Sequence, residues 1–304
     1  MTRRAVILAG GKGSRLGPYT TVLPKPLLPV GDRAILDVVV HQLQQAGFAE
    51  LTLAVSYLAH LVRAAMGDGS RWGVQIDYAE EPEPLGTVGP LANIEGLDDS
   101  FLVMNGDVLT TLDFSELLAL HRESGNALTI AAHRRVVRTD YGVLHVEGSA
   151  RRTGIVTGFE EKPEIPYIVS MGVYAMEPRV LDTIEPGSYL DLPDLVLRLI
   201  DAGEQVGSYL FDGYWLDIGR HDDYERAIDE FMRLRHLFLP GEGEGAAEGE
   251  GAGDEGEGEG TPPPPGGCDA AATGHGVPAA SMLAFGLLTV VGFRRRRPSA
   301  RRGC

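Results

Sequence analysis

A glycine-rich segment near the amino terminus combines residue types that bind phosphate. Residues 6–16 read Val-Ile-Leu-Ala-Gly-Gly-Lys-Gly-Ser-Arg-Leu, and residues 23–30 read Leu-Pro-Lys-Pro-Leu-Leu-Pro-Val. The apolar run predicts a short buried strand, and the glycines after it let the backbone turn sharply so that its amides face an anion. Arg15 and Lys25 add positive charge at the same strand end. The segment therefore predicts a phosphate-binding loop.

Two better-known phosphate loops do not fit this segment. The dinucleotide fingerprint, counted from Gly11, requires a third glycine where Leu16 stands. The Walker pattern requires Ser or Thr after its lysine, whereas Lys12 is followed by Gly13. A glycine-rich turn with chance basic residues is the remaining alternative. The ordered occurrence of the loop, Arg15 and the Lys-Pro segment argues against it.

The spacing of apolar residues predicts alternating strands and helices. Strands are expected at residues 6–9, 50–55, 74–78, 101–104, 127–133 and 206–211, and helices at 34–46, 58–66, 87–94, 112–124, 190–202 and 221–238. A further strand, at 169–174, is expected from the family resemblance described below. A hairpin-like pair is expected over residues 141–159. The alternation predicts an α/β fold with a mainly parallel central sheet.

Composition limits the partners and the compartment. The formal net charge of −16 argues against a nucleic-acid partner, which usually leaves a basic footprint. Cys268 and Cys304 are the only cysteines, so the preceding chain holds neither a disulfide nor a cysteine-based metal site. Residues 1–4 lead into the first strand without the pattern of a secretion signal. We therefore expect a cytoplasmic protein.

The two opening segments together resemble the signature of the sugar-1-phosphate nucleotidyltransferases. The resemblance covers residues 3–236, with five motifs in the family's order. It implies a Rossmann-like nucleotide-diphospho-sugar transferase fold with a small β-rich sugar-side region. It also implies that a nucleoside triphosphate and a sugar 1-phosphate react, with Mg²⁺ as cofactor, to give a nucleoside-diphosphate sugar and pyrophosphate.

The resemblance also implies roles for particular residues. Among the catalytic residues Arg15, Lys25, Asp107 and Lys162, Arg15 would hold the leaving pyrophosphate, Lys25 the α-phosphate region and Lys162 the attacking phosphate. Asp107 and Asp217 each follow a predicted strand, and Mg²⁺ would lie between these carboxylates, which otherwise repel each other. The nucleotide site would comprise Leu8, Gly10, Gly11, Gly13, Arg15, Lys25, Glu81, Gly86 and Thr87, and the sugar site Gly142, Glu161, Lys162 and Gly172.

Local sequence alone allows other interpretations of these motifs. Residues 80–87 also fit an acidic, proline-rich turn followed by a helix N-cap. Residues 105–107 fit an Asx-Gly turn, and residues 160–163 fit a solvated strand end. The aromatic pair before Asp217 fits packing better than chemistry. The family resemblance is what favours the functional interpretation in each case.

The identity of the base and of the sugar is a separate hypothesis. Glu80 and Glu81 stand where thymidylyl- and uridylyltransferase relatives often have Gln, and a carboxylate accepts two hydrogen bonds from the guanine edge. This favours a mannose- or heptose-1-phosphate guanylyltransferase. The alternatives are a thymidylyl- or uridylyltransferase of the same family and a catalytically silent regulatory subunit that binds sugar nucleotides. Retention of the charged residues argues against the silent subunit, and a homo-oligomer is compatible with the sequence.

The C-terminal residues have a different composition. We expect residues 1–240 to form the catalytic domain and residues 241–267, rich in Gly, Glu and Pro, to form a disordered linker. Residues 268–304 contain an apolar stretch and an arginine cluster at 294–297, and they resemble myxobacterial-type sorting segments. The stretch is short for a membrane span. Membrane contact without spanning and a non-functional appendage both remain open.

Overall fold

The structure, a computed structural model, describes residues 3–81, 83–148 and 154–241. Apart from Gly241, the expected linker and the C-terminal segment 268–304 lie outside these residues. None of the helices within the described ranges is long and apolar enough to cross a membrane.

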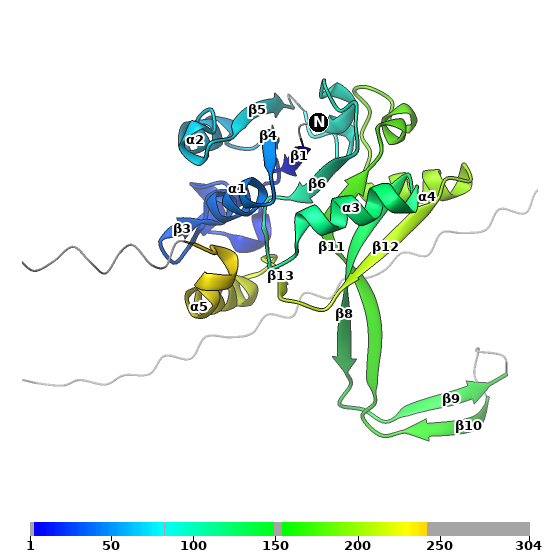
Figure 1. The fold of residues 1–304 in the computed structure, drawn as a ribbon. Helices are drawn as coiled ribbons and strands as arrows, with labels where there is room; N and C mark the ends of the chain where they lie inside the picture. The colour runs from blue at the N-terminus through cyan, green and yellow to red at the C-terminus, as the bar shows by residue number, and fades with distance from the viewer. Residues whose placement is uncertain (1–2, 82, 149–153, 242–304) are drawn as a thin grey trace, which may run out of the picture. The chain divides into compact units, whose positions relative to one another are not determined.

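A seven-stranded sheet forms the centre of the fold (Figure 1). Its strands, in spatial order, are β12 (Val206–Phe211), β8 (Leu128–Arg138), β11 (Glu164–Met176), β6 (Phe101–Asn105), β1 (Arg3–Leu8), β4 (Phe48–Val55) and β5 (Gln75–Glu80). Every pairing is parallel except those of β11, which runs antiparallel to both β6 and β8. The predicted α/β class and the mainly parallel sheet are confirmed.

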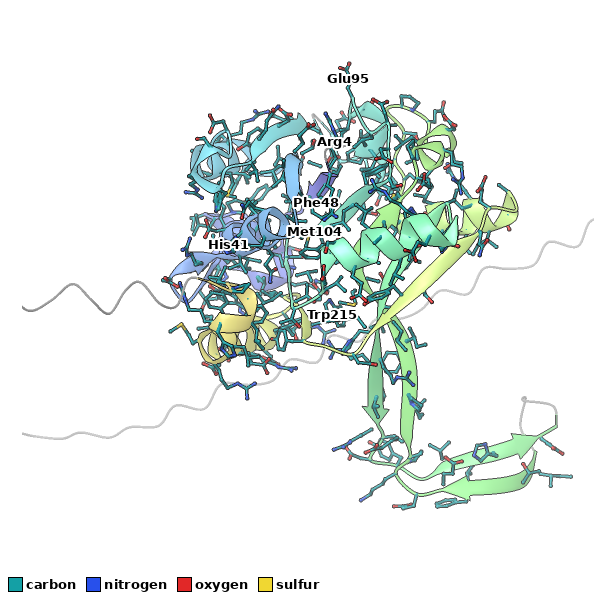
Figure 2. All side chains as sticks on the ribbon, viewed as in Figure 1. Arg4, His41, Phe48, Glu95, Met104 and Trp215 are labelled. Carbon is teal, nitrogen blue, oxygen red and sulfur yellow. The ribbon has the colours of Figure 1, made fainter. Side chains whose placement is uncertain are left out.

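Helices cover both faces of this sheet. They are α1 (Ile35–Gln45), α2 (Ala59–Met66), α3 (Phe114–Ser124), α4 (Leu192–Asp201) and α5 (His221–Phe238). Because side chains alternate along a strand, Ile7 of β1 packs in one core with α1, α2 and α3, whereas Val6 packs in another with α4. A third apolar cluster joins α5 to α1. Buried side chains such as Phe48 and Met104 fill the space between the layers (Figure 2).

Short elements complete the body. Two antiparallel ladders join β7 (Val108–Thr110) to β13 (Trp215–Asp217) and β2 (Pro29–Val30) to β3 (Arg33–Ala34). The 3₁₀ helices are η1 (Ser14–Leu16), η2 (Tyr19–Thr21), η3 (Lys25–Leu27), η4 (Ser70–Trp72), η5 (Gly89–Asn93) and η6 (Pro178–Thr183). The predicted helix at 87–94 is therefore wrong, because only a 3₁₀ turn forms there. Pro90 lacks an amide donor, and the amides of Val88 and Gly89 both donate to Leu190 O instead.

Strands β8 and β11 continue beyond the sheet as a two-stranded arm, defined here as residues 134–148 and 154–168 (Figure 1). The pairing runs from Ser170 opposite Ala132 out to Glu164 opposite Arg138. The arm carries the antiparallel pair β9 (Val143–Glu147) and β10 (Ile155–Glu160), so the predicted hairpin is confirmed. The exposed apolar side chains of the arm are Val136, Val137, Tyr141, Leu144, Val146, Ile155, Val156, Phe159, Ile165, Tyr167 and Ile168.

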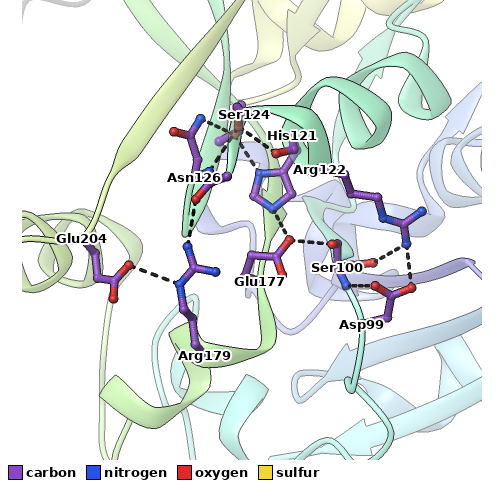
Figure 3. Close-up of polar contacts among 11 residues, drawn as sticks. Asp99, Ser100, His121, Arg122, Ser124, Asn126, Glu177, Arg179 and Glu204 are labelled. Carbon is purple, nitrogen blue, oxygen red and sulfur yellow. Dashed lines mark hydrogen bonds and ion pairs between the residues drawn. The ribbon is translucent and has the colours of Figure 1, made fainter.

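The opposite ends of β8 and β11 are fixed by a polar network against α3 (Figure 3). The buried His121 places Nδ1 2.8 Å from Thr129 Oγ1 and Nε2 3.2 Å from Glu177 Oε1. Glu177 also accepts a hydrogen bond from Ser100 Oγ at 2.5 Å. Burial lowers the pKa of the His121 imidazole, and the nearby Glu177 carboxylate opposes this shift only in part. The network therefore holds a neutral imidazole between a helix and two strands.

Candidate active site

The glycine loop after β1 has the backbone that its sequence predicts. Gly13 has φ 59°, and a Cβ built on it would lie 2.9 Å from Thr20 Cγ2 and 3.1 Å from Lys25 Cβ. Thr20 Oγ1 donates to Gly13 O at 2.9 Å and fixes the turn. Gly11 has no neighbour within 4 Å of an added Cβ, so its backbone faces open space. The loop thus combines a fixed turn with accessible backbone.

A hollow of about 380 Å³, called the nucleotide hollow below, opens beside this loop. All nine residues of the predicted nucleotide site line it: Leu8, Gly10, Gly11, Gly13, Arg15, Lys25, Glu81, Gly86 and Thr87. Asp107 and Asn105, at the end of β6, line it as well. The hollow therefore lies at the carboxyl ends of β1, β4 and β6, where open α/β sheets bind ligands.

One end of the nucleotide hollow is closed by a contact between distant segments. Gly86 has φ 81°, and a Cβ on it would come within 2.5 Å of Leu190 O. The Thr87 amide donates to Asp191 Oδ1 at 3.0 Å, and the Leu192 amide donates to Thr87 Oγ1 at 2.7 Å. Thr87 therefore joins its loop to the start of α4. The close approach at Gly86 leaves no room for a side chain between the two segments.

The two glutamates at this end differ in position. Glu81 lines the hollow, where its Oε2 accepts a hydrogen bond from the Leu85 amide at 2.8 Å, and burial raises the pKa of its carboxyl group. Glu80 is exposed and forms an ion pair with Arg63 at 3.2 Å. Only Glu81 is therefore placed to contact a ligand in this hollow.

Charged side chains line the other end of the nucleotide hollow. The buried Lys25 ammonium forms an ion pair with Asp107 Oδ2, a contact that the sequence did not predict. Asp107 Oδ1 is buried and has no hydrogen-bond partner among the described residues. Arg15 lines the hollow from η1. The arrangement leaves one carboxylate oxygen available to a cation.

Asp217 lies next to Asp107 because their strands are paired. In the β7–β13 ladder Val108 is opposite Asp217, and the Ile218 amide donates to Asp107 O at 3.2 Å. Burial and then the Asp107 charge raise the pKa of the Asp217 carboxyl group, against the opposing effects of Lys25 and Arg15. Two adjacent carboxylates, one with an unpartnered oxygen, fit a hard divalent cation. No group of three or more metal-ligating side chains occurs within the described ranges, so phosphate and water oxygens would have to complete the shell.

A second hollow of about 410 Å³ lies at the base of the arm and is called the arm-base hollow below. Asp217 lines it, and Arg15 lines both this hollow and the nucleotide hollow. The other principal side chains are Arg135 and Tyr167 from the arm, Trp215 from β13, and Arg220 at the start of α5. Trp215 lies where the arm leaves the body (Figure 2) and donates from Nε1 to Met171 O at 2.9 Å.

The predicted sugar-site residues are divided between two places. Gly172 lies beside the nucleotide hollow, with φ 75° and only 2.6 Å between an added Cβ and Asn105 Nδ2. Gly142, Glu161 and Lys162 are exposed on or next to the arm and line neither hollow. The structure thus brings the nucleotide and metal residues together and leaves these three apart from them.

Several lining residues were missed at the sequence level. Asp191 accepts a hydrogen bond from the amide of Thr87, 104 residues earlier in the sequence, and no local pattern predicts that contact. Arg135 lies just beyond the predicted strand 127–133 and Arg220 just before the predicted helix 221–238, and an isolated arginine at either position carries no functional signal. Only the pairing of β8 with β11 and of β7 with β13 brings these arginines to one hollow.

The chain is similar to known proteins in sequence and in fold. A sequence model of the family described as "Nucleotidyl transferase" matches residues 4–233. The chain is 34% identical over 260 residues to a UTP–glucose-1-phosphate uridylyltransferase from Synechocystis, covering 78% of this chain and 66% of the relative. It is 34% identical over 235 residues to a mannose-1-phosphate guanylyltransferase from Mycobacterium tuberculosis, covering 75% and 64%. In both cases the chain spans slightly less than two thirds of the relative's length.

A solved structure shares the fold. HddC from Yersinia pseudotuberculosis complexed with GMP-PN superposes with a TM-score of 0.57 at 24% identity, covering 76% of this chain and 100% of that one. The chain belongs to the nucleotidyl transferase family. The resemblance to sugar-1-phosphate nucleotidyltransferases is confirmed at the level of the family by the relatives' names.

Proposed function

We propose that the protein transfers a nucleoside monophosphate from a nucleoside triphosphate to a sugar 1-phosphate and releases pyrophosphate. The observation that carries this proposal is the convergence of the glycine loop, Arg15, Lys25 and Asp107 on the nucleotide hollow, with Asp217 next to Asp107. The names of the curated relatives support the same reaction class. Its substrates place the reaction in the cytoplasm, where nucleoside triphosphates are made.

The chemistry is a direct displacement at phosphorus. A phosphate oxygen of the sugar 1-phosphate attacks the α-phosphorus, and the bond from the α-phosphorus to the departing pyrophosphate oxygen breaks. Catalysis then depends on positioning and on charge neutralisation. Lys25 and the loop amides hold the α-phosphate region, and Arg15 holds the pyrophosphate. Mg²⁺ held by Asp107 and Asp217 supplies further positive charge to the phosphates when bound.

The arm contributes on the sugar side in this proposal. Lys162 reaches the attacking phosphate and Glu161 accepts sugar hydroxyls only when the arm bends toward the body, because both lie outside the hollows in the structure. Gly172 needs no such movement, since it already lies next to Asn105. The sugar site is therefore completed by closure of the arm.

The proposed donor is guanosine triphosphate. With Oε2 of Glu81 bound to the Leu85 amide, Oε1 lies on the side of the glycine loop, 3.5 Å from a Cβ built at Gly10. A carboxylate there accepts from the N1–H or N2–H₂ groups of guanine and cannot donate to a pyrimidine carbonyl. Mannose 1-phosphate and a heptose 1-phosphate are the proposed acceptors.

Pyrophosphate release across a matrix of substrates tests this function. GTP, UTP, dTTP and ATP are each combined with mannose, glucose and heptose 1-phosphates in the presence of Mg²⁺, using the full chain. We expect GTP with mannose or heptose 1-phosphate to give the highest kcat/KM. A more than tenfold advantage of UTP or dTTP, about 1.4 kcal/mol, would contradict the assignment of the base. Absence of pyrophosphate from every pair would contradict the activity itself.

A further inference from the structure

Helix α5 packs against the segment that connects the glycine loop to β2. Tyr224, near the start of the helix, is buried and donates from its hydroxyl group to Pro29 O at 2.7 Å. Phe231, further along α5, lies in the same apolar cluster as Leu16 of η1 and Val30 of β2. Because buried contacts occur along the helix, α5 is a fixed support for this segment.

The turn that carries Arg15, residues 13–20 and called the η1 turn below, is held on both sides of that residue. Before it, Gly13 O accepts a hydrogen bond from Thr20 Oγ1 at 2.9 Å. After it, Gly17 O lies 2.8 Å from Nε2 of His221, which comes 204 residues later in the chain. Arg15 itself is exposed. The direction of its side chain therefore depends on the backbone of the turn more than on packing around the side chain.

His221 contacts the η1 turn from the first residue of α5. Because a carbonyl oxygen only accepts hydrogen bonds, Nε2 of the imidazole carries the proton and donates to Gly17 O. The centroid of the Tyr19 ring, from the same turn, lies 5.7 Å from that of the imidazole and 5.8 Å from that of the Tyr224 ring. His221 lines neither the nucleotide hollow nor the arm-base hollow. Its effect on a ligand in either hollow is therefore indirect.

The connection between β13 and α5 lies next to Arg15. A Cβ built at Gly219 would lie 3.6 Å from Asp217 Oδ2 and 3.8 Å from Arg15 Nη1. The guanidinium charge of Arg15 opposes the rise in the pKa of the Asp217 carboxyl group. The hydrogen bond from His221 to Gly17 O therefore joins the segment that carries Arg15 to the segment that follows Asp217.

We propose that His221 is a positioning residue, which holds the η1 turn so that Arg15 meets the pyrophosphate part of the triphosphate at a fixed separation from Asp217. A guanidinium fork matches two phosphate oxygens only in a suitable orientation, so the backbone that carries it has to be fixed. The imidazole itself touches no phosphate. This inference rests on the proposed function for the identity of the ligand and adds to it the residue that orients Arg15.

Steady-state kinetics on the best substrate pair of the matrix test this role. His221→Phe keeps a ring beside Tyr19 and removes the donor, whereas His221→Gln keeps an N–H donor. His236→Phe, at an exposed position of the same helix, is the matched control. We expect the KM for the triphosphate to rise about fivefold or more in His221→Phe and to stay within about twofold in His221→Gln and in the control. The KM for the sugar 1-phosphate should stay within about twofold in all three variants.

An unchanged KM for the triphosphate in His221→Phe would overturn the proposal. An equal rise in His221→Gln would assign the effect to the ring contact with Tyr19 and would also overturn it. Thermal melting shows whether the variants fold. If His221→Phe does not fold, His221→Ala, which adds no bulk, takes its place in every comparison.

A double-mutant cycle with Arg15→Ala separates positioning from a general structural role. In the Arg15→Ala background, His221→Phe should raise the KM for the triphosphate less than about twofold, because no guanidinium group is left to orient. The loop amides and Lys25 still bind the triphosphate in that background, so the KM can be measured. A rise of about fivefold in both backgrounds would overturn the proposal.

Calorimetric titration with pyrophosphate and Mg²⁺ separates this inference from the proposed function. Binding to the full chain that His221→Phe weakens about fivefold or more, in a protein that releases no pyrophosphate from any substrate pair, would support the positioning role and contradict the activity. Turnover by the wild type with unaltered pyrophosphate binding in His221→Phe would do the reverse. Failure of the wild type to bind pyrophosphate would overturn the role of Arg15 and this inference with it.

Discussion

Strands β8 and β11 have two ends that meet very different surroundings. At the body end, the last six residues of β11, 171–176, are buried between layers of helices, and the network of His121, Thr129 and Glu177 fixes them against α3. At the arm end, the first five residues, 164–168, are exposed and are paired with β8 alone. Both ends contain Ile or Val together with Tyr. The difference lies in what covers the strands and not in which residues form them.

This contrast separates a rigid part of the site from a movable one. The glycine loop and Asp107 directly follow strands of the central sheet, whose positions many buried contacts determine. Asp217 ends β13, which pairs with β7 next to Asp107. The arm has only a two-stranded ladder with exposed apolar side chains, and such a ribbon has little stability of its own. We therefore expect the nucleotide and metal residues to be preorganised, and the arm residues to act through closure.

The largest expected effect is at the rigid end. Asp107→Asn and Asp217→Asn keep the shape of the side chain and remove its charge, so turnover should fall about 100-fold or more while the fold survives. Initial rates at several Mg²⁺ concentrations and a thermal melt measure the two quantities. Asp98→Asn, at an exposed position outside both hollows, is the control. Near-normal magnesium-dependent turnover in both active-site variants would remove these residues from the metal site.

A smaller effect is expected on the arm. Lys162→Ala should lower kcat/KM for the sugar 1-phosphate about tenfold or more, because closure brings the ammonium to the attacking phosphate. The KM for the triphosphate should stay within about twofold, since Lys162 does not line the nucleotide hollow. Arg138→Ala, on the same arm and paired with Glu164, serves as control. If Lys162→Ala behaves as the wild type, the arm does not close on the substrate.

The smallest effect is on stability at the body end of the strands. The pKa of His121 is lowered by burial, so below its unfolded value of about 6.5 the unfolded chain binds a proton that the folded chain does not. Stability should therefore fall as the pH drops from 7.5 to 5.5, measured as the urea midpoint. The fall should be smaller in His121→Gln and unchanged in His236→Gln, which alters an exposed histidine. An equally large fall in His121→Gln would exclude this imidazole as the cause.

The sequence predicts most helices and strands within a few residues, because the periodicity of apolar residues shows which face of a helix or strand packs against the rest of the protein. It places β8 at 127–133 and β11 at 169–174, whereas both strands extend into the arm. The residues of a strand do not show at which point along the strand the helices that pack on it end. The nine nucleotide-site residues converge because they follow strands whose carboxyl ends share one edge. The partnership of Lys25 with Asp107, and the arginines of the arm-base hollow, depend on contacts between distant segments that no local pattern encodes.

The ladder between β7 and β13 affects which parts of the chain tolerate changes in length and sequence. It joins the segment directly after Asp107 to the segment that ends at Asp217. Strands β8 to β12, the arm and helices α3 and α4 all belong to the excursion between these segments. Because backbone hydrogen bonds fasten its two ends, insertions or deletions at the arm tip leave the spacing of the carboxylates unchanged. The arm can thus vary in length and sequence while the two carboxylates keep their places.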